Sequence, residues 1–286
     1  MLFLRNALPT TLVHKTKGNP MSDWSGLEFI KCDIQGETLV VTINRPEVYN
    51  ALNKAGKAEI VKAIRIGNKD EAIRSIILTA EGKAFCSGQD LNDRAVQGKE
   101  GKKVDLGHTL ETEWNPLINA IRESKKLVVG AINGVAAGAG LSVAMACDMI
   151  VAAPKVKFVS GFSQLGLAPD AGSSFTFVKG MGYSKTLEFF LFNEALYSED
   201  LYGWGMINRV SDNPLEEALT MTQKINKMAP LSLELIKKNL QEASERDFAS
   251  VMARETATQR FLGASNDYQE GLEAFFEKRK PQFSGS

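Results

Sequence analysis

The first part of the chain alternates apolar and polar positions in the way that is typical of β-strands. Two β-rich runs lie between residues 28 and 44, and Leu39, Val41 and Ile43 alternate with their neighbours in the second run. A period of two places these side chains on one face of a strand. We therefore expect a hairpin here, with its turn near residues 35–36.

Helical and strand-like patterns then follow each other in turn. Residues 54–67 place Ile60, Val61 and Ile64 on one helical face, and residues 74–79 form a short apolar strand. The elements predicted next are a helix at 109–124, a strand at 127–132, a helix at 138–147 and a strand at 149–152. Such alternation favours a layered α/β fold with a mainly parallel sheet.

The character of the pattern changes after residue 175, where long helical patterns dominate. Pro214 and Pro230 signal a first helical turn or a helix break. We therefore expect an N-terminal extension at 1–26, an α/β core at 27–200 and a helical region at 201–286.

Composition and charge exclude several functional classes. Hydrophobic residues make up 44% of the 286 residues, which is enough for a large buried core. Lys and Arg number 34, as do Asp and Glu, so no global positive field attracts nucleic acid or an anionic membrane. No apolar run reaches the roughly 18 residues that a transmembrane helix needs.

Histidine and cysteine are scarce. The chain has two histidines and three cysteines, and no cysteine pair has the C-x-x-C spacing. We therefore expect no Cys/His zinc site, and three separated cysteines indicate reduced intracellular thiols rather than a disulfide framework. We accordingly expect a cytoplasmic protein.

The N-terminal twenty residues carry three basic side chains and no acidic residue precedes Asp23. This composition resembles a transit peptide and would place the protein in an organellar matrix. The competing and favoured interpretation is a start at Met21, preceded by a misplaced start or a disordered extension.

Two glycine-containing loops join predicted strands to predicted helices, at residues 84–91 and 133–140. Glycine lets a ligand approach the backbone, and a helix start offers N–H donors, so such a loop can receive a negative oxygen. Neither loop has the spacing of a nucleotide site, because a Rossmann fingerprint would need glycine at Val143 and no Gly-Lys-Ser/Thr is present. Tight packing of helix on strand is the alternative role.

A third candidate segment, at residues 166–174, contains Asp170. This carboxylate could act chemically or could cap the helix expected to start near Ser173. No nucleophile elbow surrounds Ser87 or Ser142, and Cys86 is interpreted as a packed thiol.

Several segments together resemble the crotonase superfamily, the enoyl-CoA hydratase/isomerase group. The resemblance covers about residues 27–283 and is carried by Asn44–Leu52, Ala84–Leu91, Ile132–Gly140, Ala146–Asp148, Gly203–Val210 and Phe276–Lys280. Residues 85–94 and 166–170 look like the ring-epoxide isomerase branch of phenylacetate catabolism. Residues 173–177 look like Δ3,Δ2-enoyl-CoA isomerases.

This resemblance implies a fold and a reaction. The fold is a ClpP-like spiral of ββα units followed by a helical trimerisation region. The thioester carbonyl is held by the backbone N–H groups of Gln89 and Ala139, and Asp170 is the general acid/base. Hydratases of the family use two glutamates, whose positions here hold Ser142 and Phe162. We therefore expect an acyl-CoA isomerase, with enoyl-CoA hydratase and a non-catalytic acyl-CoA binder as alternatives.

The resemblance also implies the remaining contacts and partners. Residues expected to line the acyl-CoA site are Val48, Asn50, Ala51, Ser87, Gly88, Asp90, Leu91, Gly138, Gly140 and Phe162. Phe275 and Lys278 match tail positions that reach the ligand in relatives; a helix's apolar face and a solvated helix end are their alternatives. Coenzyme A is part of the substrate, so we expect no separate cofactor and no metal. The expected assembly is a homotrimer or a dimer of trimers, without nucleic acid or membrane.

Overall fold

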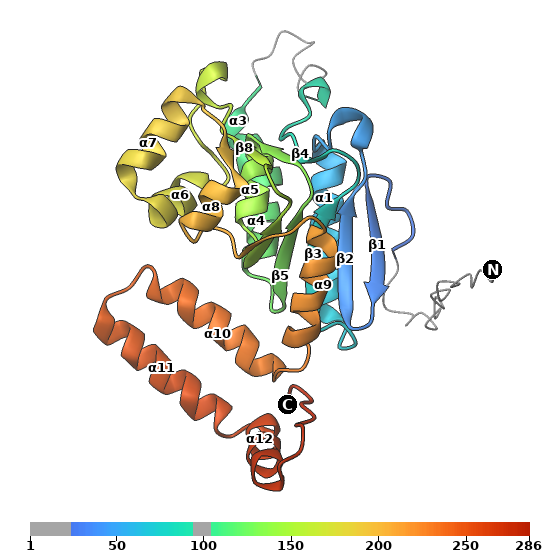
Figure 1. Cartoon of the computed structure of the whole chain (residues 1–286), viewed down its shortest axis with the longest axis vertical. Coiled ribbons are helices and arrows are strands. Elements are labelled where there is room, and N and C mark those ends of the chain that lie inside the picture. Colours follow the sequence, from blue (N-terminus) through green and yellow to red (C-terminus); the bar gives the residue numbers. More distant parts are fainter. Residues whose placement is uncertain (1–23, 94–103) are drawn as a thin grey trace, which may run out of the picture.

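The computed structural model describes residues 24–93 and 104–286, and Figure 1 shows their arrangement. Most of the predicted N-terminal extension, including the segment that resembles a transit peptide, therefore lies outside the described residues. Within those two described stretches, no helix has both the length and the apolar character needed to cross a membrane.

A six-stranded sheet forms the centre of the molecule (Figure 1). Its spatial order is β1-β2-β3-β5-β7-β10. These strands span Ile30–Gln35, Thr38–Ile43, Ser75–Ala80, Leu127–Ile132, Met149–Ala152 and Arg209–Val210. The β1–β2 pair is antiparallel, as the predicted hairpin requires, and the other pairs are parallel.

A smaller second sheet lies beside the first and has the order β4-β6-β8-β9. Its strands span Ala84–Cys86, Val135–Ala137, Lys157–Val159 and Leu196–Tyr197. Each of the pairs β3/β4, β5/β6 and β7/β8 contributes one strand to each sheet, and the pairs stack in chain order. The predicted spiral of ββα units is thereby confirmed.

Both faces of the main sheet are covered, because successive strand residues point to opposite sides. On one side, helices α1 (Lys54–Lys69) and α4 (Asn115–Arg122) join the largest core cluster. On the other, Val40 and Ile77 pack against Ala218 of α9 (Pro214–Ile225). Strand β10 and helix α9 follow residue 200, so the sheet layer uses residues on both sides of the expected boundary.

The remaining helices surround this core or extend from it. They are α3 (Leu106–Thr109), α5 (Ala139–Met145), α6 (Ser173–Met181), α7 (Tyr183–Phe192), α8 (Ser198–Gly203), α10 (Pro230–Ala243), α11 (Phe248–Leu262) and α12 (Asn266–Glu277). Single helical turns occur at Pro46–Val48 and Ser163–Leu165, and the π-helical turn η2 (Leu110–Trp114) joins α3 to α4. In Figure 1, α10–α12 extend away from the sheets at one end of the long axis.

Candidate active site

The loop after β4 is paired with the segment that precedes α1. The Leu52 N–H donates to the Gly88 carbonyl at 2.8 Å, and the Asp90 N–H donates to the Leu52 carbonyl at 3.1 Å. This parallel bridge uses groups on either side of Gln89 and leaves the Gln89 N–H out of the pairing. That N–H is therefore oriented away from Leu52, as a ligand-binding donor must be.

The two glycine loops meet at Gly88. Its φ of +97° is a left-handed conformation that favours glycine. A side-chain carbon there would lie 2.9 Å from the Ala137 carbonyl oxygen and 3.3 Å from the Ala139 nitrogen. Ala139 is the first residue of α5, so its N–H has no acceptor within the helix. The structure thus brings the backbone on either side of Gly88 against the start of α5.

Gly140 packs even more tightly against the first loop. A side-chain carbon at Gly140 would approach the Cys86 carbonyl oxygen to 2.3 Å, which no side chain tolerates. Cys86 itself is completely buried, and this burial raises the pKa of its thiol to about 12. The thiol stays protonated at neutral pH, which supports the interpretation of Cys86 as a packing residue.

Asp170 lies half-buried on the loop that leads into α6. Its backbone carbonyl accepts hydrogen bonds from Ser142 Oγ on α5 at 3.2 Å and from Ser173 Oγ at 2.8 Å. The helix cap is Gly172, with φ +81°, and no side chain caps this helix. The alternative role of Asp170 as an N-cap is therefore wrong, and its loop is instead attached to the helix that Ala139 begins.

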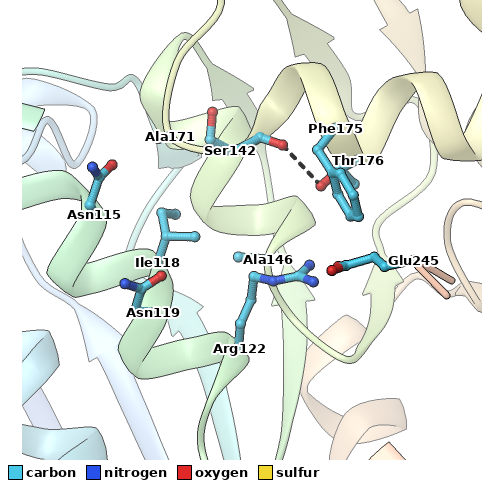
Figure 2. A pocket seen from close by; sticks show the side chains of 11 residues that line it. Asn115, Ile118, Asn119, Arg122, Ser142, Ala146, Ala171, Phe175, Thr176 and Glu245 are labelled. Carbon is cyan, nitrogen blue, oxygen red and sulfur yellow. Dashed lines mark hydrogen bonds between the residues drawn. The ribbon is translucent and has the colours of Figure 1, made fainter. Parts of the chain in front are cut away.

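A cavity of about 420 Å³ lies between α4, α5, α6 and the turn after α10 (Figure 2). It is adjacent to the predicted site, because Ser142 follows Ala139 by one helical turn and Ala171 follows Asp170. The lining is Asn115, Ile118, Asn119, Arg122, Ser142, Ala146, Ala171, Gly172, Phe175, Thr176 and Glu245. Its walls thus mix amide, charged and hydroxyl groups with a few apolar side chains.

One rim of this cavity is fixed by hydrogen bonding at the start of α6. The Thr176 hydroxyl donates to the Gly172 carbonyl at 3.2 Å, the dashed contact in Figure 2. On the opposite side, Arg122 from α4 and Glu245 from the turn after α10 extend toward one another. The cavity therefore has charged groups at one end and Ser142 at the other.

Asn50 has a structural role that the sequence interpretation did not anticipate. It is completely buried, and its Nδ2 donates to the Glu81 carbonyl at 2.8 Å and the Ala84 carbonyl at 2.7 Å. Its Oδ1 accepts from the Arg45 N–H at 2.8 Å. The side chain of Asn50 thus bonds within its own loop and to the segment that leads into β4, and its contact with the ligand stays a prediction.

The neighbouring predicted contacts lie on the same loops. Arg45 donates to Asp90 Oδ2 at 2.8 Å and to the Ala51 carbonyl at 2.6 Å, so Asp90 is a buried ion-pair partner. Val48 is half-buried and accepts at its carbonyl from Ser87 Oγ. The side chains of Ser87 and Leu91 are exposed. Gly138, with φ +53°, precedes Ala139 and is the N-cap of α5.

Phe162 and two tail residues, Phe275 and Lys278, were also predicted to contact the ligand. Phe162 is buried and packs against Phe190, with ring centroids 6.3 Å apart. Phe275 is 76% exposed on α12, and Lys278 is the C-cap of the same helix. In Figure 1, α12 lies at the opposite end of the long axis from β4. A single chain therefore does not bring the tail residues to the loops around Gln89.

Two residues beside the site had no role in the sequence interpretation. Lys57 Nζ and Trp114 Nε1 both donate to Gln89 Oε1, at 2.9 Å and 3.0 Å. The sequence pattern did indicate a buried position for Lys57. It precedes Ile60 and Ile64 by three and seven residues and so shares their buried helical face. Trp114 carried no comparable signal.

Comparison with known proteins gives this geometry a context. A family model described as enoyl-CoA hydratase/isomerase matches residues 33–286. The chain is 36% identical to the 1,2-epoxyphenylacetyl-CoA isomerase of Escherichia coli (strain K12), over 91% of this chain and 99% of that protein. It is 36% identical to a probable enoyl-CoA hydratase of Rhodobacter capsulatus, over 90% and 98%. A crystal structure of an enoyl-CoA hydratase from Polaromonas sp. JS666 has a TM-score of 0.83 at 33% identity, over 89% and 99%.

Proposed function

Since the chain belongs to the enoyl-CoA hydratase/isomerase family, we propose that it isomerises acyl-CoA thioesters with one aspartate as the proton carrier. The observation that carries this proposal is the position of Asp170. Its loop is hydrogen-bonded through the Asp170 carbonyl to Ser142, one helical turn beyond Ala139. A carboxylate on this loop can therefore reach a substrate whose carbonyl lies at the start of α5.

The reaction proceeds through a thioester enolate. The Asp170 carboxylate takes a proton from the carbon next to the thioester carbonyl, and the electron pair of the broken C–H bond delocalises onto the thioester oxygen. The Gln89 and Ala139 N–H groups stabilise that oxygen, and each such donor contributes roughly 2.7–4 kcal/mol to lowering the barrier. Asp170 then returns the proton to another carbon, which moves the double bond without adding water.

The residues at the two glutamate positions favour isomerisation over hydration. Ser142 has a hydroxyl that donates to the Asp170 carbonyl, and Phe162 packs in the core against Phe190. Neither side chain can act as a carboxylate base on a water molecule, so Asp170 would have to serve alone. Hydration of a 2-enoyl-CoA remains the second candidate, because one of the similar proteins is a probable enoyl-CoA hydratase.

The cavity beside Ser142 suggests where the acyl group lies. It borders both Ser142 and Ala171, which flank the proposed reacting centre, and it has room for a small acyl group. Its amide and charged walls suit an acyl group that carries oxygen. A ring-epoxide ester has this character, and the similar Escherichia coli protein is a 1,2-epoxyphenylacetyl-CoA isomerase.

We further propose that the C-terminal helices assemble three copies of the chain, as a trimer or as a dimer of trimers. Large apolar side chains are exposed on these helices, namely Leu240, Phe248, Phe261, Phe275 and Phe276. Burial of such a surface against a second copy would be favourable. Light scattering on the purified protein should give the mass of three or six chains, and the mass of one chain would contradict the assembly proposal.

One assay tests the proposed reaction. A 3-enoyl-CoA, a 2-enoyl-CoA and a ring-epoxide acyl-CoA are incubated in turn with the wild type and with Asp170→Asn. We expect conversion of the 3-enoyl or the ring-epoxide ester by the wild type and its loss in the variant. Hydration of the 2-enoyl ester with no isomerisation would favour the hydratase, and binding without any turnover would favour a non-catalytic acyl-CoA protein.

A further inference from the structure

Both polar atoms of the Gln89 side chain, Oε1 and Nε2, form hydrogen bonds. Its Oε1 accepts from Lys57 Nζ at 2.9 Å and from Trp114 Nε1 at 3.0 Å. Its Nε2 donates to the Asp90 carbonyl at 3.1 Å. Lysine and the indole nitrogen are donors only, so the oxygen of the Gln89 amide must face them. The side chain therefore has one orientation, which is set by α1 and by the end of η2.

The two donors to Gln89, Lys57 and Trp114, also contact each other. Lys57 Nζ forms an ion pair with Glu113 Oε2 at 2.5 Å and lies 4.6 Å from the centroid of the Trp114 ring. Lys57 is only 1% exposed, as is Trp114. A lysine buried this completely is costly unless it is paired and hydrogen-bonded. Lys57 and Trp114 therefore contact Gln89 directly, and Glu113 is linked to it through Lys57.

A π-helical turn brings these partners to one place. Glu113 and Trp114 are the last two residues of η2, and both contact Lys57. The wider π-helical turn locally changes the helical register, and such turns are frequent at functional sites. A buried ion pair is weak evidence for stability by itself, because an apolar replacement is often as stable. The cluster of Lys57, Glu113 and Trp114 is therefore better explained by the Gln89 side chain that it holds.

The backbone of Gln89 is the point that the cluster can control. Its neighbours Gly88 and Asp90 are fixed by hydrogen bonds to Leu52, while the Gln89 N–H takes no part in that pairing. The direction of this N–H depends on the peptide plane between Gly88 and Gln89. The Leu52 N–H holds this plane at the Gly88 carbonyl, and the Gln89 side chain, anchored at Oε1 and Nε2, holds the residue on the other side of the N–H.

We propose that Lys57, Glu113 and Trp114 are positioning residues for the Gln89 N–H donor. They hold the Gln89 side chain and thereby keep the backbone N–H directed at the thioester oxygen. The proposal deepens the proposed function, because it takes from it the role of Gln89 as a donor. It assigns these three residues no contact with the substrate.

The test separates positioning from folding. Gln89→Met keeps the backbone N–H and removes the anchor, and Trp114→Phe keeps a ring beside Lys57 and removes one hydrogen bond. The probe is 2,4-hexadienoyl-CoA, whose conjugated carbonyl absorbs at longer wavelength when hydrogen bonds polarise it. We expect both variants to bind the probe with a smaller red shift than the wild type.

Kinetics supply the second readout. Loss of a complete oxyanion donor costs about 100- to 1000-fold in kcat, so we expect a fall of roughly 10-fold or more for Gln89→Met, with KM little changed. Trp204→Phe is the matched control, because Trp204 packs against the core with Lys185 over its ring and is not a partner in the hydrogen bonds, ion pair or ring contact described for Lys57 and Gln89. This control should keep the wild-type red shift and kcat.

Each outcome decides the proposal. A wild-type red shift and kcat in folded Gln89→Met would overturn it, and so would a wild-type protein that leaves the probe spectrum unchanged. A wild type that shifts the spectrum but isomerises no ester would contradict the proposed function alone, and the red shifts of the variants would still decide the positioning role. If Trp114→Phe fails to fold, Gln89→Met decides, because it leaves Lys57, Glu113 and Trp114 intact.

Discussion

Gly88 lies so close to Ala139 that a side-chain carbon at residue 88 would be 3.3 Å from the Ala139 amide nitrogen. This contact joins the loop after β4 to the first turn of α5. It brings together the two segments that carry the proposed N–H donors. The distance between those donors therefore depends on the absence of a side chain at Gly88.

Gly88→Ala should lower kcat by about two orders of magnitude, because the new methyl group would push the two loops apart and misalign a donor. Gly205→Ala is the control, because Gly205 also has a positive φ, +73°, but nothing within 4 Å of a side-chain carbon. We expect the control to lose some stability and to keep its kcat. Equal kcat values for Gly88→Ala and the wild type would show that the loop contact is irrelevant to turnover.

Asn50→Ala should destabilise the protein by about 3 kcal/mol, because it leaves the buried Ala84 carbonyl and the partly buried Glu81 carbonyl without this donor. Asn50 also has φ +57°, a conformation that asparagine tolerates better than alanine. The measurement is urea unfolding at fixed protein concentration, with the exposed Asn92→Ala as control. Identical unfolding midpoints for the two variants would refute the role of the Asn50 side chain in holding its loop to the Glu81 and Ala84 carbonyls.

Ala146→Leu should discriminate between acyl groups of different size. Ala146 lines the cavity beside Ser142, so a larger side chain there reduces the space for the acyl group. We expect kcat/KM to fall further for a ten-carbon than for a four-carbon 3-enoyl-CoA. An equal fall for both esters would mean that the acyl group lies outside this cavity.

The C-terminal tail after α12, residues 279–286, should detach from α12 in acid. Hydrogen bonds from Arg279, at 2.6 and 2.8 Å, and from the Gln282 N–H lower the pKa of Glu270 from 4.5 to about 2. A lowered carboxyl pKa contributes stability that is present above about pH 4.5 and is lost as the pH falls toward about 2. Hydrogen exchange of the tail peptide, corrected for intrinsic rates, should accelerate over this window.

The control for this pH dependence is Glu270→Gln, which cannot ionise at this position. Its tail should exchange faster than that of the wild type at pH 6 and change little on acidification. The same acid-induced acceleration in Glu270→Gln as in the wild type would assign the effect to another group.

The sheet and the glycine loops were predictable because their signals are local. The alternation at Leu39, Val41 and Ile43 defines β2, and the predicted strand at 127–132 coincides with β5. The segments around Gly88 and Gly140 were recognisable because close backbone contact tolerates no side chain there. Such constraints act within a few residues, so the sequence alone displays them.

The supporting contacts could not be predicted because they join distant residues. Lys57 and Trp114 meet at Gln89 across 32 and 25 positions, and the π-helical turn that allows this has no simple sequence signature. Asn50 matched a ligand-lining segment, yet it is buried by contacts to β4. Phe275 matched a ligand-binding tail position, but its helix lies far from β4 within one chain.

The central claim, that Asp170 is the proton carrier, is tested most directly by Asp170→Asn with a 3-enoyl-CoA in deuterated water. The wild type should convert the ester to its conjugated 2-enoyl isomer. The variant should bind the ester but lose conversion by at least about 100-fold, consistent with the usual contribution of a general acid/base. Undiminished conversion by Asp170→Asn would contradict the account.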